Sequence, residues 1–196
     1  MADETTFSIV NTAVADPSTV GLASFGIALF TLSFLNAGIV GPNAISILIP
    51  LSLLTALIHF FACMTGFKKN ELFTAVVFGI YGMFWAVWGL INLGVSLKWY
   101  ELDAKTLMIF CIAYTIFTAI IFIATLVTNK AVILTLAVLL AVFLLLDFGL
   151  AGSPGMIVWA GYLGMIDGLL ALYLTAAGLL GAMYGRSVLP VGPVSK

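Results

Sequence analysis

The sequence predicts an all-α integral membrane protein with six transmembrane helices. Hydrophobic residues make up 63% of the chain and charged residues only 8%, whereas soluble domains carry roughly 25% charged residues. Six apolar runs each approach the ~20 residues that a helix needs to cross the hydrocarbon core. Short breaks with Gly, Pro, Asn or Lys separate these runs, as is typical of helix ends.

In chain order, the predicted spans are 20–40, 45–65, 72–97, 105–127, 131–150 and 156–184. The fourth and fifth spans are the least clearly divided, because only Thr128-Asn129-Lys130 separates them. A single helix over 105–150 would be far longer than a bilayer requires, so two helices with a tight turn are predicted. We therefore expect a polar tail over 1–19, a transmembrane domain over 20–185 and a second tail over 186–196.

The distribution of Lys and Arg predicts the orientation, since short cytoplasmic loops are enriched in them. The predicted loops on one side contain only Lys98 and Lys105. The other side carries the larger group, Lys68, Lys69, Lys130, Arg186 and Lys196. We expect cytoplasmic N and C termini and a multi-pass protein of the plasma membrane.

Small residues recur at helical spacing within the spans. Gly161, Gly164 and Gly168 share one face of the sixth predicted helix, and Gly79, Gly82 and Gly89 lie in the third. Small residues allow close helix contact in lipid, so a tight bundle is the first interpretation. A narrow passage or a contact between subunits is the alternative.

Three ionisable residues, His59, Asp147 and Asp167, fall within the spans, where such groups are costly and mark functional sites. Asp147 lies near the end of its span and is expected to reach the interface. By helical rise, His59 and Asp167 lie ~21 Å and ~18 Å from the same side of the membrane. We expect them to meet in a proton-linked site, because a histidine beside a carboxylate titrates near physiological pH. A structural hydrogen bond between helices is the alternative.

The sequence lacks the patterns of several other classes of protein. A single His and two separated cysteines, Cys63 and Cys111, do not make a metal site. No cofactor is expected, and no catalytic motif indicates an enzyme. A net charge of −1 does not suit a nucleic-acid partner.

Several stretches resemble the acetate uptake transporter family, which includes bacterial acetate–succinate permeases. The family signature, Asn-Pro-Ala-Pro-Leu-Gly-Leu, resembles Asp16-Pro17-Ser18-Thr19-Val20-Gly21-Leu22, in which Pro17, Gly21 and Leu22 are kept and Asp16 replaces Asn. Tyr81-Gly82-Met83-Phe84-Trp85 is similar to the family's Tyr-Gly-Ser-Phe-Trp motif. The stretch Gly185–Gly192 is similar to the bacterial C-terminal ending.

The resemblance implies a homo-hexamer in which each protomer holds a narrow path for acetate, with succinate taken by some members, and proton coupling. It places the constriction of the path at Phe25, Tyr81 and Leu139. His59 stands where the family has Gln, and Asp167 has no acidic counterpart in bacterial members.

The resemblance implies transport of acetate, and of other small carboxylates such as succinate, and we expect acetate to pass with a proton. A carboxylate needs hydrogen-bond donors along its path through hydrocarbon. The candidate substrate-binding residues are His59, Tyr81, Asn92 and Thr55. The alternatives are an acetate anion channel without proton coupling and a channel for a neutral solute such as urea or ammonia. A purely structural membrane scaffold ranks below these.

Overall fold

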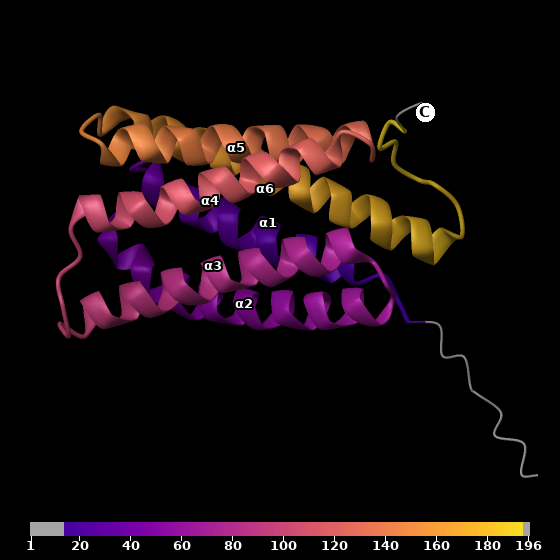
Figure 1. The fold of residues 1–196 in the computed structure, drawn as a ribbon, viewed down its shortest axis with the longest axis horizontal. Coiled ribbons are helices and arrows are strands. Elements are labelled where there is room, and N and C mark those ends of the chain that lie inside the picture. Colours follow the sequence, from indigo (N-terminus) through magenta and orange to yellow (C-terminus); the bar gives the residue numbers. More distant parts are fainter. Residues whose placement is uncertain (1–13, 194–196) are drawn as a thin grey trace, which may run out of the picture.

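A computed structural model of the chain describes residues 14–193, and within them six long helices form an elongated bundle (Figure 1). The helices are α1 (Pro17–Asn36), α2 (Ile45–Lys68), α3 (Leu72–Ser96), α4 (Ala104–Thr125), α5 (Lys130–Leu150) and α6 (Gly155–Tyr184), with a short 3-10 helix, η1 (Pro42–Ala44), before α2. All six are long and apolar enough to cross a membrane. The predicted fold class is confirmed. Residues 1–13 of the predicted N-terminal tail, and Lys196, lie outside the described residues.

The first helix begins at Pro17, three residues before the predicted span. The Asp16 side chain accepts a hydrogen bond of 2.9 Å from the Ser18 backbone N–H, which satisfies one of the free donors of the first turn. Pro17 fits here because backbone N–H groups in the first turn have no acceptor within the helix, so a residue without an N–H loses no hydrogen bond. Asp16 and Pro17 of the signature stretch therefore start α1.

The tight turn predicted between the fourth and fifth spans is confirmed. Helix α4 ends at Thr125, two residues before its predicted end, and α5 begins at Lys130. The Asn129 side chain caps α5 by accepting a hydrogen bond of 3.0 Å from the Val132 backbone N–H. The backbone of the capping residue is extended rather than helical, so α4 does not continue into α5.

The segment after α6 folds back onto the start of α5. The backbone carbonyls of Gly192 and Val191 accept hydrogen bonds from Lys130 N (2.8 Å) and Ala131 N (3.0 Å). The Tyr173 hydroxyl donates to the Pro190 carbonyl at 2.7 Å. The two backbone bonds satisfy donors that the first turn of α5 would otherwise leave free.

Asp103 caps α4, and this cap makes the stability of the helix sensitive to pH. Its carboxylate accepts hydrogen bonds from the Thr106 hydroxyl (2.6 Å), Thr106 N (3.0 Å) and Lys105 N (2.9 Å). These bonds, those of Thr106 first, hold the pKa of Asp103 below its usual value of 3.8. The stabilisation is present above pH 3.8 and is lost as the pH falls through the lower pKa of the folded protein.

We expect Asp103→Ala to lower the melting temperature at neutral pH, because the cap is lost. Asp103→Asn keeps a capping oxygen but does not titrate. In thermal unfolding of the detergent-solubilised protein, the wild type should therefore lose stability relative to Asp103→Asn as the pH is lowered from 3.8 through the lower pKa of the folded protein. Parallel curves for these two proteins over that range would contradict the assignment.

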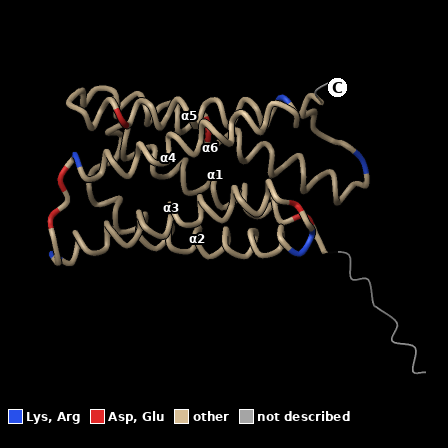
Figure 2. The backbone as a smooth tube through the Cα atoms, viewed as in Figure 1, with Lys and Arg blue, Asp and Glu red and all other residues tan. Residues whose placement is uncertain are grey.

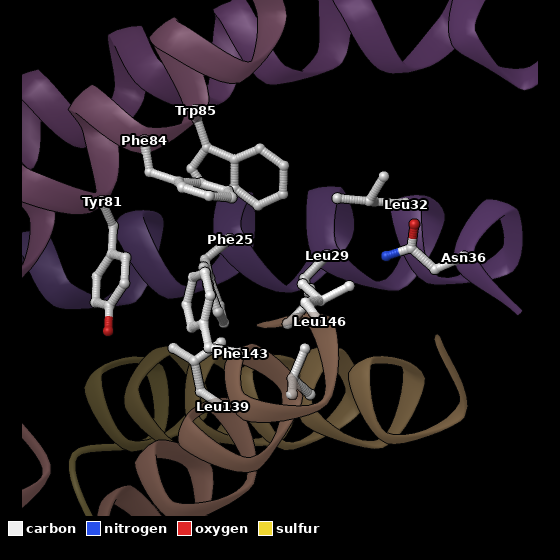
Figure 3. A pocket seen from close by; sticks show the side chains of 11 residues that line it. Phe25, Leu29, Leu32, Asn36, Tyr81, Phe84, Trp85, Leu139, Phe143 and Leu146 are labelled. Atoms are coloured by element: carbon white, nitrogen blue, oxygen red, sulfur yellow. The ribbon is translucent and has the colours of Figure 1, made fainter. Parts of the chain in front are cut away.

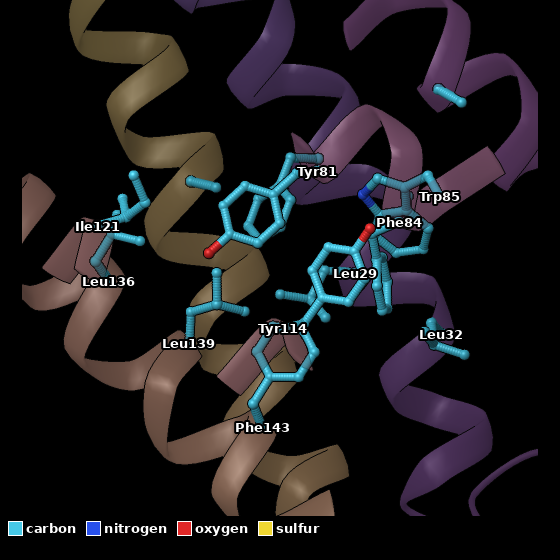
Figure 4. Packing of buried hydrophobic residues seen from close by; sticks show 14 of the residues in the cluster. Leu29, Leu32, Tyr81, Phe84, Trp85, Tyr114, Ile121, Leu136, Leu139 and Phe143 are labelled. Atoms are coloured by element: carbon cyan, nitrogen blue, oxygen red, sulfur yellow. The ribbon is translucent and has the colours of Figure 1, made fainter. Parts of the chain in front are cut away.

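Each helix packs against its neighbours in the order α3, α2, α1, α6, α5, α4, and together they surround a central interior. Helix α1 lies between α2 and α6, α3 packs on α2, and α5 packs between α6 and α4. Long side chains bridge α3 and α4: the Tyr81 and Thr118 hydroxyls are 2.8 Å apart, and the Phe84 and Tyr114 ring centroids are 4.9 Å apart. Figure 4 shows buried residues of α1, α3, α4 and α5 meeting in this interior.

The three glycines that share one face of α6 lie against α1, which confirms the packing interpretation. A Cβ built on Gly168 would come within 2.9 Å of the backbone nitrogen of Phe30 and 3.0 Å of the Gly26 carbonyl oxygen. Gly164 lies against Ser33, and Gly161 against the backbone of Ala37. Three glycines of α3 lie against α2 in the same way: Gly79 at Cys63, Gly82 at His59 and Gly89 at Ser52.

Apart from Asp147 in α5 and Asp167 in α6, the charged residues of the described part of the chain lie at or near the two ends of the bundle (Figure 2). The α2–α3 turn, the α4–α5 turn and the described ends of the chain lie at one end, called here the terminal end (Figure 1). The α3–α4 connection lies at the other, called here the loop end. This separation agrees with the predicted grouping of Lys and Arg, and the protein is a multi-pass membrane protein.

Candidate transport pathway

Four cavities follow one another through the interior of the bundle. From the loop end to the terminal end, cavities 1 to 4 have volumes of about 640, 390, 340 and 490 Å³. Cavity 1 is lined by the end of α1 and the starts of α4 and α6, at Asn36, Leu107 and Ile157. Cavity 4 reaches the starts of α1 and α3, at Ser18 and Thr74. The row therefore extends along most of the bundle.

Neighbouring cavities share lining residues. Cavities 1 and 2 share Leu32, Asn36, Phe84 and Leu146. Cavities 3 and 4 share Leu22, Val77, Phe78, Thr135 and Leu136. No residue that lines cavities 1 to 4 in the described part of the chain is Asp, Glu, Lys or Arg. The walls are therefore mainly apolar, with a few polar groups.

Cavities 2 and 3 meet at Phe25 of α1, Tyr81 of α3 and Leu139 of α5, the three residues that line both. Figure 3 shows these side chains close together at one side of cavity 2. They are almost fully buried, with 8%, 4% and 4% of their surfaces exposed. A narrow apolar point between two cavities restricts the passage of water and solutes. The predicted constriction residues are thus brought together by three different helices.

Neighbouring groups hold the constriction side chains in place. The Phe25 ring lies 6.2 Å from the Tyr81 ring and 6.5 Å from the Trp85 ring, measured between centroids. The Tyr81 hydroxyl is bonded to Thr118 of α4, so the phenol is fixed at both ends. Aromatic pairs in such tilted or edge arrangements stabilise the packing by more than their buried area alone.

His59 lines cavity 3, on the terminal side of the constriction. Its Nε2 atom lies 3.2 Å from the Gly21 carbonyl oxygen. Because a carbonyl only accepts, Nε2 carries the hydrogen and Nδ1 of the neutral ring is left with a lone pair. Nδ1 is buried and has no hydrogen-bond partner in the described residues. His59 thus places an imidazole with a free ring nitrogen in the wall of cavity 3.

Asn36 and Trp85 place polar groups on the loop side of the constriction. Both line cavity 2, and Asn36 also lines cavity 1. The indole N–H of Trp85 is buried and has no acceptor among the described residues, and Figure 3 shows the Asn36 amide at the far side of the cavity from Tyr81. Together with His59, these groups give the row polar atoms on both sides of the constriction.

His59 and Asp167 do not meet, so the direct contact expected from their depth is wrong. His59 is bonded to Gly21, whereas both Asp167 oxygens are buried without a partner among the described residues. The separation follows from the fold, because α1 lies between α2 and α6. Asp147 does not simply reach the interface either, since it accepts a hydrogen bond of 2.6 Å from Thr115 of α4 and its other oxygen is buried.

Two predicted substrate-binding residues do not line cavities 1 to 4. The Asn92 side-chain nitrogen donates to the Trp88 carbonyl of its own helix at 2.8 Å. Thr55 is buried, with 1% of its surface exposed. Asn36, Trp85 and Thr135 line the row instead. Thr135 lies one helical turn before Leu139 on the same face of α5, which is a signal that the sequence contains.

The signature residues have structural roles beside the row. The Gly21 carbonyl is bonded to His59, and the absence of a side chain at Gly21 leaves room for the Phe78 ring. Leu22 lines cavities 3 and 4. This stretch therefore starts α1 and also shapes the terminal half of the row.

Comparisons with known proteins agree with this arrangement. The chain is 30% identical over 184 residues to the succinate-acetate/proton symporter SatP of Escherichia coli K12, which covers 93% of this chain and 97% of that protein. It is 28% identical to acetate permease A of Emericella nidulans over 90% of this chain and 65% of that protein.

A solved structure described as that of the bacterial acetate channel SatP has the same fold. It superposes with a TM-score of 0.87 at 29% sequence identity, over 92% of this chain and all of that chain. These relatives are transporters or channels, not enzymes. Residues 3–195 match the GPR1/FUN34/yaaH family. The chain therefore belongs to the GPR1/FUN34/yaaH family of membrane proteins.

Proposed function

We propose that this protein carries acetate across the plasma membrane, together with a proton, through the row of cavities in each protomer. The observation that carries the proposal is that Phe25, Tyr81 and Leu139 form the shared wall of cavities 2 and 3. Two cavities divided by one narrow apolar point suit a small solute that passes in steps. The names of the relatives support acetate as that solute, with succinate as a second candidate.

The chemistry of the walls suits a short carboxylate. Its charged end needs hydrogen-bond donors when it leaves water. Trp85 and Asn36 offer N–H groups, and His59 offers one at Nδ1 when its ring is protonated. Its methyl group fits against the aromatic and aliphatic wall. Because no Lys or Arg lines the row in the described residues, an anion would be held weakly, and weak sites allow a solute to leave again.

Transport into liposomes tests the proposal. Purified protein is reconstituted, and uptake of labelled acetate is followed with and without an inward proton gradient, with succinate and urea as competitors. Gradient-stimulated uptake that urea does not reduce is expected. Flux that follows only the acetate gradient would indicate an anion channel, in line with the description of the solved relative. Uptake no faster than in protein-free liposomes would refute acetate transport.

His59 is the proposed proton-linked residue of the terminal side. A protonated imidazole beside the constriction attracts a carboxylate, so uptake should rise as the pH falls. His59→Gln keeps an N–H donor for the Gly21 carbonyl but cannot take up a proton. We expect this variant to assemble normally and to lose the rise in uptake at acidic pH. A pH profile identical to that of the wild type would remove His59 from the coupling mechanism.

We also propose that both termini face the cytoplasm and that the protein assembles as a homo-hexamer. The whole row of cavities lies within one protomer, so each subunit of a hexamer would hold a separate path. The distribution of Lys and Arg between the two ends supports placing the terminal end in the cytoplasm.

A further inference from the structure

Asp167 is a carboxylic acid in the middle of α6 without a counter-charge. None of its surface is exposed, and neither carboxyl oxygen has a hydrogen-bond partner in the described residues. The one ion pair among residues 14–193 joins Lys69 to Glu71, at the α2–α3 turn. An unpaired ionisable group at membrane depth is costly and marks a functional site.

The contacts of its neighbours place Asp167 close to the constriction. The next residue, Gly168, lies against Gly26 and Phe30 of α1, and Gly164 lies against Ser33. Along the bundle axis, Asp167 therefore lies at the height of the α1 turn that begins just after Phe25. Phe25, which precedes Gly26 in α1, is thus the constriction residue near this carboxyl.

No cation faces Asp167 from the elements that pack around it. Helix α1 has no ionisable side chain between Pro17 and Asn36. Helix α5 has Lys130 and Asp147, which lie near its two ends. The other ionisable residues of α6 itself are Tyr162, Tyr173 and Tyr184. The other helices bring His59 of α2, Tyr81 of α3 and Tyr114 of α4 into the interior, and none of these is a Lys or an Arg.

The two protonation states of Asp167 would affect a passing carboxylate differently. Burial without a partner strongly disfavours the ionised form, so the resting form is the neutral acid. When Asp167 loses its proton, its negative charge acts across an apolar interior in which charges are screened weakly. A carboxylate at Phe25 and Tyr81 would then be repelled, whereas a neutral solute would not.

We propose that Asp167 sets the charge selectivity of the constriction: its protonated form lets a carboxylate pass, and its ionised form excludes one. The inference rests on the proposed transport of acetate and adds a second proton-sensitive group to it. His59 and Asp167 would act in different parts of the pH range. His59 increases uptake at the acidic end of the profile, and Asp167 limits uptake at the alkaline end.

Substituting Asp167 with a neutral residue of the same shape tests the proposal. Labelled acetate uptake into liposomes is measured from about pH 6 to about pH 9, and uptake by protein-free liposomes is subtracted at each pH. We expect Asp167→Asn to match the wild type at pH 6 and to exceed it by about tenfold at pH 9, since one unscreened charge accounts for such a factor. Asp167→Ser, which is smaller and cannot overpack the site, should give the same profile.

Asp147→Asn is the matched control, because it removes the other carboxyl within the spans and keeps an oxygen that can accept the Thr115 hydrogen bond. Its profile should follow the wild type. A constant ratio of Asp167→Asn to wild type over the pH range would overturn the inference while leaving acetate transport in place. Absence of acetate uptake by the wild type would instead refute the proposed function on which the inference depends.

Discussion

Gly168→Ala should destabilise the bundle, whereas Gly181→Ala on the same helix should not. A methyl group at Gly168 would lie 2.9 Å from both the backbone nitrogen and Cβ of Phe30 and 3.0 Å from the Gly26 carbonyl oxygen, which is too close for any of these atoms. Two of them belong to the α1 backbone and cannot rotate away, so α1 and α6 would have to separate. Overpacking of this kind costs typically 1–3 kcal/mol.

Gly181 provides the control because it undergoes the same change without a clash. The nearest atom to a methyl group there is the Arg186 carbonyl oxygen, at 3.8 Å. Replacing a helical glycine with alanine stabilises a helix by up to about 1 kcal/mol. Thermal unfolding in detergent should therefore give opposite shifts for the two variants. Equal melting temperatures would show that the close α1–α6 contact does not contribute to the stability of the bundle.

Leu139→Ala should increase acetate flux and relax selectivity for size. The Leu139 side chain closes one side of the boundary between cavities of about 390 and 340 Å³, and alanine would let them join. An increase of about three- to tenfold corresponds to a barrier lowered by about 0.7–1.4 kcal/mol. Succinate uptake should gain more than acetate uptake, because the larger solute is hindered more by the constriction.

Leu134→Ala is the control for this change. Leu134 lies on the same helix and has 50% of its surface exposed, whereas Leu139 has 4%. The same atoms are removed from a surface that faces away from the row, so flux should not change. Size-exclusion profiles check that both variants remain folded, since removal of a buried leucine costs about 2–5 kcal/mol. Unchanged flux in folded Leu139→Ala would mean that the constriction does not limit transport.

The fold was predictable from the sequence because the requirement that a span be apolar and long enough is local to each helix. The spacing of Gly161, Gly164 and Gly168 also predicted a close-packed face correctly. Helix ends were less predictable, since caps such as Asp16 depend on one side-chain hydrogen bond rather than on hydropathy. That is why α1 begins earlier than its apolar run.

The site was only partly predictable because depth along a helix does not give the position across the bundle. His59 and Asp167 were placed at similar depths by helical rise, yet they belong to helices on opposite sides of α1. The constriction residues came from the family resemblance, and the structure brings them together. Asn36 was missed because a single polar residue within an apolar run does not indicate which way it points. Thr135 was missed although its spacing to Leu139 places both residues on one face of α5.

Blocking the row at one position tests most directly whether acetate passes through the interior. Thr135 lines cavities 3 and 4 and has 2% of its surface exposed, whereas its neighbour Leu134 points away from the row with 50% exposed. Labelled acetate uptake into liposomes is compared for Thr135→Trp, Leu134→Trp and the wild type. We expect uptake to be lost in Thr135→Trp and retained in the other two proteins. Wild-type uptake in folded Thr135→Trp would contradict a path between these helices.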